Sequence, residues 1–166
     1  PTTPDKDGAV DLGLSVKWAA YNVGATKPEE YGDYYSWGEV VTKNDYTESK
    51  YKFTYIDSYG YVEYSLPEGL SDISGTKYDA ATANWGKEWR MPTKLELMEL
   101  EDQSTAVWTS YNGIDGMRII GPNGNSIFLP SGGYRSEYGG KGKGGSGKYW
   151  TSTTDNGWSN KGAFIY

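Results

Sequence analysis

The chain of 166 residues carries a formal net charge of −6 and contains neither cysteine nor histidine. One domain is the default at this length, and the missing residue types exclude disulfides, thiol nucleophiles, Ser-His-Asp triads and histidine-ligated metal centres. The negative charge argues against a general nucleic-acid binder, and no apolar run reaches the roughly 20 residues of a membrane span.

The interior is expected to be aromatic rather than aliphatic. Leucine, isoleucine, valine and phenylalanine are scarce, whereas the chain has 7 tryptophans and 16 tyrosines. One such ring can bury roughly 150–250 Å², so a core of aromatic and small residues is feasible. The indoles predicted to lie in this core are Trp18, Trp37, Trp85, Trp89, Trp108 and Trp150.

The N-terminal part combines a linker with two expected strands. Residues 1–8 have the composition of a linker or a processed start, and a single domain is expected over residues 9–166. Alternating apolar and polar residues over 12–18 predict a half-buried strand. After a polar loop over 22–31, residues 34–37 favour a short aromatic strand.

The middle of the chain is predicted to be a long loop followed by a short helix. Residues 40–75 are rich in tyrosine and weakly patterned, which indicates a loop region with room for a hairpin. Residues 79–85 contain three alanines and precede Gly86, so they favour a short helix that ends at this glycine.

A second helix is predicted over residues 93–101. Thr93 and Glu96 fit a capping box, in which each side chain satisfies one orphan backbone N–H at the helix start. Arg90, just before the helix, is expected to pair with a nearby carboxylate or carbonyl in a structural role. The apolar stripe of this helix is expected to comprise Leu97, Met98 and Leu100.

From residue 106 onward the pattern changes to strands. The turn-forming run 121–125 is a strong hairpin signal. The predicted strands cover residues 107–111, 117–120, 126–129, 149–153 and 163–166. Two short helices in a mostly antiparallel β layout with long loops make the fold class α+β.

Four segments of the chain resemble the Fibrobacter-type major paralogous domain. They are residues 11–25 (DLGLSVKWAAYNVGA), 32–39 (GDYYSWGE), 81–93 (ATANWGKEWRMPT) and 128–135 with 149–153 (FLPSGGYR and YWTST). The resemblance covers most of the chain in the right order and implies a C-type lectin-like fold. Residues 89–93 resemble the Trp-Arg-Leu-Pro-Thr step of sulfatase-modifying-factor relatives.

The resemblance also implies an extracellular or outer-cell-surface location, because the family is common in surface proteins of gut Bacteroidetes. Formylglycine-generating relatives need cysteines and ergothioneine-pathway relatives need histidines, so neither activity transfers. The Glu-Pro-Asn, Gln-Pro-Asp and Trp-Asn-Asp tripeptides of calcium-dependent sugar lectins do not occur here. Relatives often continue with an arginine-containing closing strand, so we expect either a sheet without it or a truncated sequence.

Three further motifs favour ordinary structure over chemistry. The glycine-rich run 139–148 fits parts of two phosphate-binding patterns, but Tyr149 stands where a P-loop needs Ser or Thr. A mobile surface loop is therefore expected there. Asp5, Asp7 and the 155–157 turn offer too few oxygen ligands for an EF-hand. No cofactor is expected, and a structural calcium ion stays an alternative.

Glycoside hydrolysis is the enzymatic alternative, because it needs two carboxylates about 5–10 Å apart. Glu39 and Asp155 are the candidates for this role. The other acidic residues are expected to lie on the solvated surface, namely Glu29, Glu30, Asp33, Glu96, Glu99, Glu101 and Asp102.

Residues 133–160 have the tyrosine, tryptophan, serine, asparagine, glycine and arginine content of an adaptable recognition surface. The predicted ligand-binding residues are Tyr134, Arg135, Glu137, Tyr138, Tyr149, Asp155, Asn156, Trp158, Ser159 and Asn160. The resulting hypothesis is a non-catalytic recognition or adhesion domain for a glycan or protein, without nucleic acid as a partner. A structural or assembly module of a larger surface or pilus-tip protein is the alternative, and an exposed edge without a partner is a third interpretation.

Overall fold

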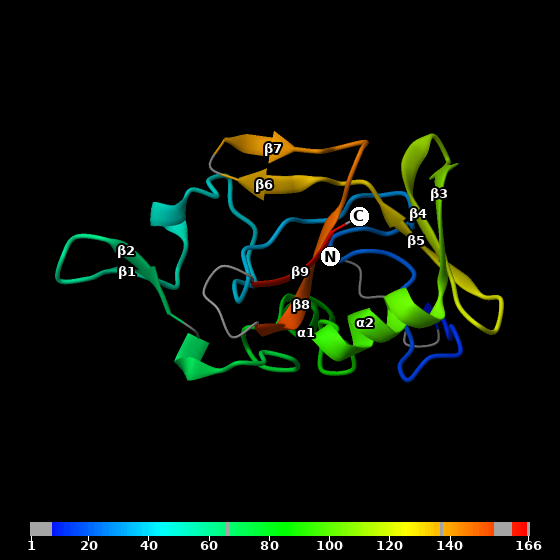
Figure 1. Cartoon of the computed structure of the whole chain (residues 1–166), viewed down its shortest axis with the longest axis horizontal. Helices are drawn as coiled ribbons and strands as arrows, with labels where there is room; N and C mark the ends of the chain where they lie inside the picture. Colours follow the sequence, from blue (N-terminus) through cyan, green and yellow to red (C-terminus); the bar gives the residue numbers. More distant parts are fainter. Residues whose placement is uncertain (1–7, 66, 137, 155–160, 166) are drawn as a thin grey trace.

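The computed structural model of the chain describes residues 8–65, 67–136, 138–154 and 161–165 (Figure 1). The described part contains the helices α1 (Ala80–Trp85) and α2 (Lys94–Gln103) and the short 3-10 turns η2 (Glu48–Lys50) and η3 (Pro67–Gly69). Its strands are β1 (Thr54–Ile56), β2 (Val62–Tyr64), β3 (Thr105–Tyr111), β4 (Ile114–Ile120), β5 (Ser126–Pro130), β6 (Tyr134–Ser136), β7 (Gly139–Lys141), β8 (Lys148–Thr154) and β9 (Lys161–Ile165). The fold is α+β with mostly antiparallel sheets.

The helices begin and end where local signals predict. The Asp79 carboxylate accepts the Thr82 N–H at the start of α1, and Gly86 follows the last helical residue. Thr93 and Glu96 form the predicted capping box of α2. Leu97 and Leu100 of this helix are buried as expected.

Met98 does not belong to the buried stripe of α2, because its side chain is 46% exposed. Arg90 takes the structural role predicted for it. Its guanidinium donates to both carboxylate oxygens of Glu96 and to the carbonyl oxygen of Met91. The step before α2 is therefore tied directly to the first turn of the helix.

The strands of the second half also follow the sequence pattern. β3, β4 and β5 form an antiparallel sheet in chain order, with Trp108 opposite Met117 and Arg118 opposite Phe128. β8 pairs with β9 and crosses the middle of the molecule in Figure 1. The five strands predicted from residue 106 onward are all present, extended at most ends by one to three residues.

Two predicted strands near the N-terminus do not form. Residues 12–18 are irregular and make only an isolated bridge between Val10 and Trp18. The reason is local, since Asp11 accepts the Gly13 N–H and Gly13 has a positive φ of 77° that turns the backbone. Leu12 is nevertheless fully buried, because its side chain faces the sheet rather than a neighbouring strand.

Residues 34–37 are likewise extended without strand pairing. Their carbonyl groups accept side-chain donors instead of a partner strand. The Tyr46 hydroxyl donates to the Tyr34 carbonyl at 2.6 Å, and the Tyr51 hydroxyl donates to the Trp37 carbonyl at 2.8 Å. Side-chain hydrogen bonds thus replace the predicted backbone ladder.

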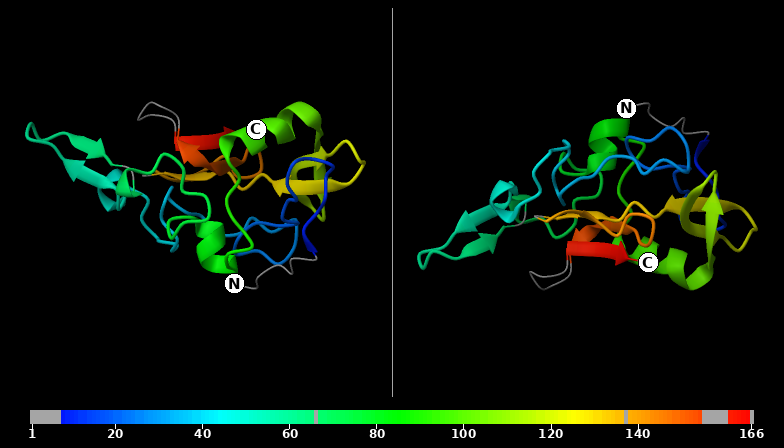
Figure 2. Two further views of the ribbon diagram at one scale, coloured as in Figure 1. Left: turned by 90° about the horizontal axis from the view of Figure 1, so that it is seen from below. Right: turned by 90° about the horizontal axis from the view of Figure 1, so that it is seen from above.

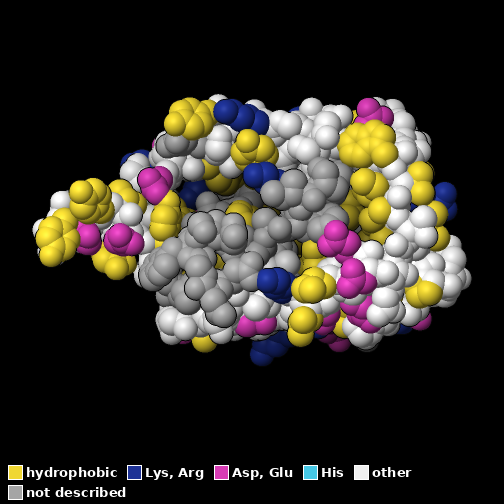
Figure 3. All heavy atoms as spheres, viewed as in Figure 1, with side chains coloured by type: hydrophobic (Ala, Val, Ile, Leu, Met, Phe, Trp, Pro, Cys, Tyr) yellow, Lys and Arg dark blue, Asp and Glu magenta, His cyan; other side chains and the backbone are white. Residues whose placement is uncertain are grey.

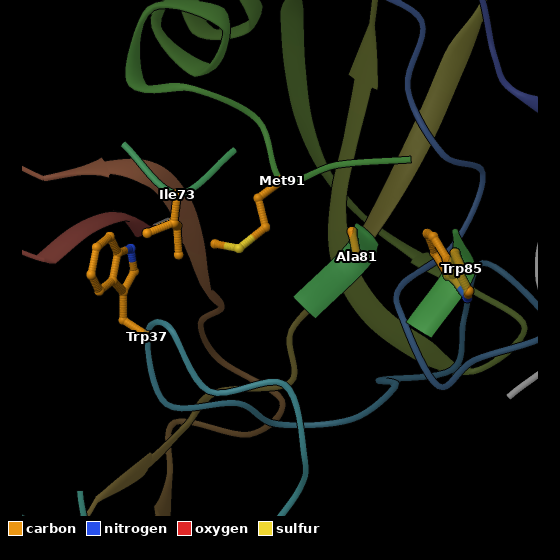
Figure 4. Packing of buried hydrophobic residues seen from close by; sticks show 5 residues of the cluster. All are labelled: Trp37, Ile73, Ala81, Trp85 and Met91. Carbon is orange, nitrogen blue, oxygen red and sulfur yellow. The ribbon is translucent and has the colours of Figure 1, made fainter. Parts of the chain in front are cut away.

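The core consists of two clusters: the first is rich in aromatic rings, as expected, whereas the buried residues of the second are all aliphatic, contrary to the expectation. In the first, Trp37 and Trp85 pack with Ile73, Ala81 and Met91. Figure 4 shows the Met91 side chain directed toward Ile73 and Trp37. The second cluster joins residues of the N-terminal segment, α2 and the β4–β5 pair, namely Leu12, Leu100, Ile119 and Ile127.

The tryptophans do not all lie in this core. Trp18, Trp89 and Trp150 are partly buried and pack against the clusters, as expected. Trp108 contradicts the prediction, because it is 45% exposed. It lies on β3, the outer strand of its three-stranded sheet, where both faces are largely open.

The tyrosine-rich middle region holds the hairpin for which the sequence left room. β1 and β2 pair antiparallel and project from the body of the molecule in both views of Figure 2. We call residues 54–64 the projecting hairpin. Its exposed side chains include Tyr59 at 84% and Ile56 at 71%. No helix in the described residues has both the length and the apolar content to cross a membrane.

Candidate functional site

The segment 31–37 lies against the late strands and holds them in place. The Tyr34 hydroxyl donates to the Gly132 carbonyl at 2.6 Å. The Trp150 indole donates to the Tyr35 carbonyl at 2.8 Å, and the Trp37 indole donates to the Thr151 carbonyl at 2.9 Å. Because buried polar groups are costly when unpaired, these bonds fix an early segment of the chain beneath β6 and β8.

The glycine-rich run is not simply the mobile surface loop that the sequence predicted. Residues 139–141 form β7 and pair with β6 in an antiparallel hairpin. Gly133, just before β6, makes a parallel bridge to Gly147 just before β8. Gly133 packs so closely here that a Cβ atom would lie 2.7 Å from the Lys143 nitrogen and against the Lys141 carbonyl.

Tyrosine rings and cationic side chains form pairs on this hairpin and the neighbouring 31–34 segment. Four pairs place a cation over a ring: Arg135 on Tyr34 at 4.9 Å from the centroid, Lys141 on Tyr138 at 5.0 Å, Lys143 on Tyr31 at 4.3 Å and Lys148 on Tyr134 at 4.0 Å. We call these eight residues the tyrosine–cation surface. Figure 3 shows apolar and basic side chains side by side over β6 and β7.

The surface is positively charged although the protein is acidic. Residues 131–154 contain four basic residues and one acidic residue, a net charge of +3, whereas the rest of the chain carries −9. Burial raises the pKa of the Tyr34 hydroxyl and the nearby Arg135 guanidinium opposes that rise. The tyrosine is therefore a neutral hydrogen-bonding group at neutral pH, and the surface keeps its cationic character.

A cavity of about 990 Å³ reaches from this surface toward the core. Tyr34, Tyr134 and Arg135 of the tyrosine–cation surface line it, and so do core residues such as Trp85 and Leu97. Its size is that of a ligand site rather than a packing defect, since ligand pockets typically measure about 300–1,000 Å³.

Two indole N–H groups beside the cavity have no acceptor within the described part of the chain. Trp18 and Trp85 both line the cavity, and the Nε1 atom of each is buried. A buried donor without an acceptor costs roughly 1–3 kcal/mol. Neither Nε1 atom is accessible to a ligand in the cavity, because both are buried.

The structure brings together those predicted ligand-binding residues that it describes. Tyr134, Arg135 and Tyr138 belong to the tyrosine–cation surface, and Tyr138 is 76% exposed. Tyr149 lines the cavity but its hydroxyl is engaged, since it donates to the Pro130 carbonyl at 2.8 Å. The predicted residues that lie outside the described part are Glu137, Asp155, Asn156, Trp158, Ser159 and Asn160.

Sequence reasoning missed the aromatic and basic partners of these residues. Tyr31 and Tyr34 precede β6 by about a hundred positions, and no local pattern links them to it. Lys141, Lys143 and Lys148 fall in the glycine-rich run 139–148, which the sequence predicts to be a loop. A usable signal was present, because the 131–154 stretch is the basic part of an otherwise acidic chain.

The acidic residues considered for catalysis or metal binding are mostly engaged in structure. Glu39 forms an ion pair with Lys43 at 2.8 Å and accepts the Lys52 N–H. Glu99 accepts from the Ser15 hydroxyl and N–H. Among the described residues, no group of three acidic side chains is arranged to hold a metal ion. Asp5, Asp7 and the 155–157 turn lie outside the described residues.

Comparison with protein-family models, curated proteins and solved structures finds no match to this chain.

Proposed function

We propose that this chain is a non-catalytic recognition domain that binds its ligand at the tyrosine–cation surface and the adjoining cavity. The observation that carries this proposal is the gathering of four ring–cation pairs around the β6–β7 hairpin, two of which join segments about a hundred residues apart. Rigid aromatic rings give contact area at little entropic cost, and cations held over them are already oriented for a partner.

A glycan suits this site better than a protein does. Tyr138 is 76% exposed, so its ring can contact a sugar ring beside the Lys141 ammonium that lies over it. Arg135 and Lys148 line the cavity and can donate hydrogen bonds to hydroxyl oxygens. Both features fit a ligand that presents apolar ring faces and many hydroxyl groups.

The proposed fold family is C-type lectin-like, on the strength of the resemblance to the Fibrobacter-type major paralogous domain. An α+β arrangement of short helices and small antiparallel sheets is compatible with it. The proposed location is extracellular or on the outer cell surface, where such domains are displayed. Ligand binding would need no metal, because ring stacking, hydrogen bonds and cationic groups are all supplied by the chain itself.

An assembly module is the second candidate, and the projecting hairpin favours it. Tyr59, Tyr61 and Ile56 on this hairpin are 84%, 68% and 71% exposed. Apolar side chains gathered on a protruding element commonly mark a protein contact. A stable complex with a neighbouring domain through residues 54–64, without any glycan ligand, would support this alternative instead.

A glycan array tests the proposal, with neutral and acidic glycans screened against the wild-type chain. Tyr138→Ala should weaken binding to any hit by about tenfold or more, because it removes an exposed contact ring. Tyr59→Ala on the projecting hairpin is the matched control, since Tyr59 is 84% exposed and Tyr138 is 76% exposed. Equal loss in both variants, or no glycan hit at all, would contradict the proposed function.

A further inference from the structure

We propose that the ligand is an acidic polysaccharide, one that carries carboxylate or sulfate groups on its sugar rings. This inference rests on the proposed recognition function and adds the chemical class of the ligand. It assigns the sugar rings to the tyrosines and the acidic groups to the cations of the tyrosine–cation surface.

The cations of this surface are available to a ligand. Arg135, Lys141, Lys143 and Lys148 are all exposed. The ion pairs of the described residues join other side chains, namely Lys43 with Glu39, Lys77 with Glu68 and Arg90 with Glu96. Within the described part of the chain, the four cations therefore meet aromatic rings but no carboxylate.

The rings restrict these cations without neutralising them. A cation–π contact at an exposed site contributes about 0.5–1 kcal/mol, which is enough to bias a flexible side chain toward one arrangement. Long side chains otherwise lose roughly 0.5–1.5 kcal/mol of conformational free energy each when a ligand immobilises them. Because the tyrosine rings already orient the four cations, this cost is lower, and the positive charges can still attract an anionic partner.

The extent of the site argues against nucleic acid. β6 and β7 have three residues each, which is roughly 10 Å of strand. The remainder of the chain carries a net charge of −9 and would repel a long, uniformly charged phosphate backbone. An oligosaccharide with a few spaced acidic groups fits the size and charge of this surface.

An acidic peptide fits less well, because of the glycines. An extended peptide would add to the outer edge of β7 and draw specificity from side-chain pockets along it. Gly139 and Gly140 of this strand provide no such pockets. Gly139 has open space around its Cβ position, which leaves room beside Tyr138 for the broad face of a sugar ring.

The test is isothermal titration calorimetry with three probes: polygalacturonate, chondroitin sulfate and the neutral polysaccharide dextran. We expect binding to at least one acidic probe and at least tenfold weaker binding to dextran. Raising NaCl from about 50 to about 500 mM should weaken acidic binding by about tenfold, because salt screens exposed charges.

A charge variant localises the effect. The triple change Lys141→Gln, Lys143→Gln and Lys148→Gln should lower affinity for the acidic probe by about tenfold or more. The matched control carries Lys50→Gln, Lys52→Gln and Lys87→Gln, which removes the same charge from exposed positions elsewhere. Its affinity should stay within about twofold of the wild type.

The outcomes separate the two proposals. If neutral glycans bind as well as acidic ones, and Tyr138→Ala but not the lysine triple variant reduces binding, the acidic class is wrong and the recognition function stands. If polyglutamate or single-stranded DNA binds at least as tightly as the acidic polysaccharides, the glycan class is overturned. If no polysaccharide binds, both proposals fail.

Discussion

The guanidinium of Arg135 lies 4.9 Å from the ring centroid of Tyr34, although the two residues are about a hundred positions apart in the sequence. The Tyr34 hydroxyl donates at the same time to the Gly132 carbonyl, three residues before Arg135. One tyrosine thus anchors the backbone that leads into β6 and orients a cation that β6 carries. The surface is therefore built into the fold rather than assembled by a flexible loop.

Gly133→Ala should destroy the tyrosine–cation surface. The added methyl group would meet the Lys141 carbonyl and lie 2.7 Å from the Lys143 nitrogen, so β6 and β7 cannot keep their positions. Gly139→Ala is the matched control, because it has a similar positive φ of 87° but open space around it. We expect ligand affinity to fall by about tenfold or more in the first variant only. Equal affinities in the two variants would show that this hairpin geometry is irrelevant to binding.

Asp79 is expected to be the most costly carboxylate to remove. It is fully buried, and it accepts the N–H groups of Gly75 at 2.9 Å, Thr82 at 3.0 Å and Met91 at 2.8 Å. Asp79→Ala leaves these N–H donors without their acceptor and removes a helix cap. The free energy of unfolding measured in urea should therefore fall by about 3–5 kcal/mol. Asp79→Asn keeps one amide oxygen as an acceptor and should recover part of the loss. A cost below about 1 kcal/mol for the alanine variant would refute this assignment.

The two helices were predictable because their signals are local. A capping box needs only Thr93 and Glu96, and the start of α1 needs only Asp79. The sequence does not predict that Asp79 also accepts the Met91 N–H, because these two residues become neighbours only in the folded chain. Contacts between distant segments leave no periodic trace in a sequence.

The late strands and the early ones illustrate the same limit. Turn residues at 112–113 and 121–125 set the β3–β5 sheet locally. The alternation over 12–18 predicted a strand wrongly, because the turn at Asp11–Gly13 interrupts the backbone and Leu12 packs into the core from an irregular segment. β7 was missed because glycines have low strand propensity, and its pairing is set by β6.

Only part of the tyrosine–cation surface could be predicted from the sequence. Composition identified Tyr134, Arg135 and Tyr138, since a recognition surface has a recognisable residue content. It did not identify Tyr31 or Tyr34, which reach the surface only through tertiary contacts. Two of the four tyrosines of the tyrosine–cation surface therefore depend on the fold rather than on local sequence.

Trp37→Phe should cost about 2–4 kcal/mol of stability. The Trp37 side chain is 2% exposed and its indole donates to the Thr151 carbonyl, so the change leaves a void and removes this hydrogen bond. Trp108→Phe on the open strand β3 should cost less than about 1 kcal/mol. Thermal unfolding of the two variants compares them directly, and a larger loss for Trp108 would reverse our assignment of the core.

The Arg90–Glu96 pair should make stability depend on acid pH. Hydrogen bonds from Arg90 lower the pKa of Glu96 below its ordinary value of 4.5, and burial opposes this only in part. A lowered pKa in the folded state stabilises the fold above the unfolded pKa, and the contribution is lost as pH falls through the folded value. Glu96→Gln should therefore cost about 1 kcal/mol at neutral pH and progressively less in acid.

Glu68→Gln provides the contrast for this pH dependence. Glu68 pairs with Lys77 at 2.5 Å, but both side chains are more than half exposed. Solvent screens such a pair, so the variant should match the wild type in denaturant unfolding at every pH. A pH profile for Glu96→Gln that runs parallel to the wild type would disprove the stabilising role of the Arg90 pair.

The most direct test of the tyrosine–cation surface as the recognition site is an amide NMR titration of the 15N-labelled chain with an oligogalacturonate. We predict that the largest shift changes fall on residues 31–36 and 132–148. Changes centred instead on the projecting hairpin or on β3, or a spectrum that does not respond to any acidic or neutral oligosaccharide, would contradict the account.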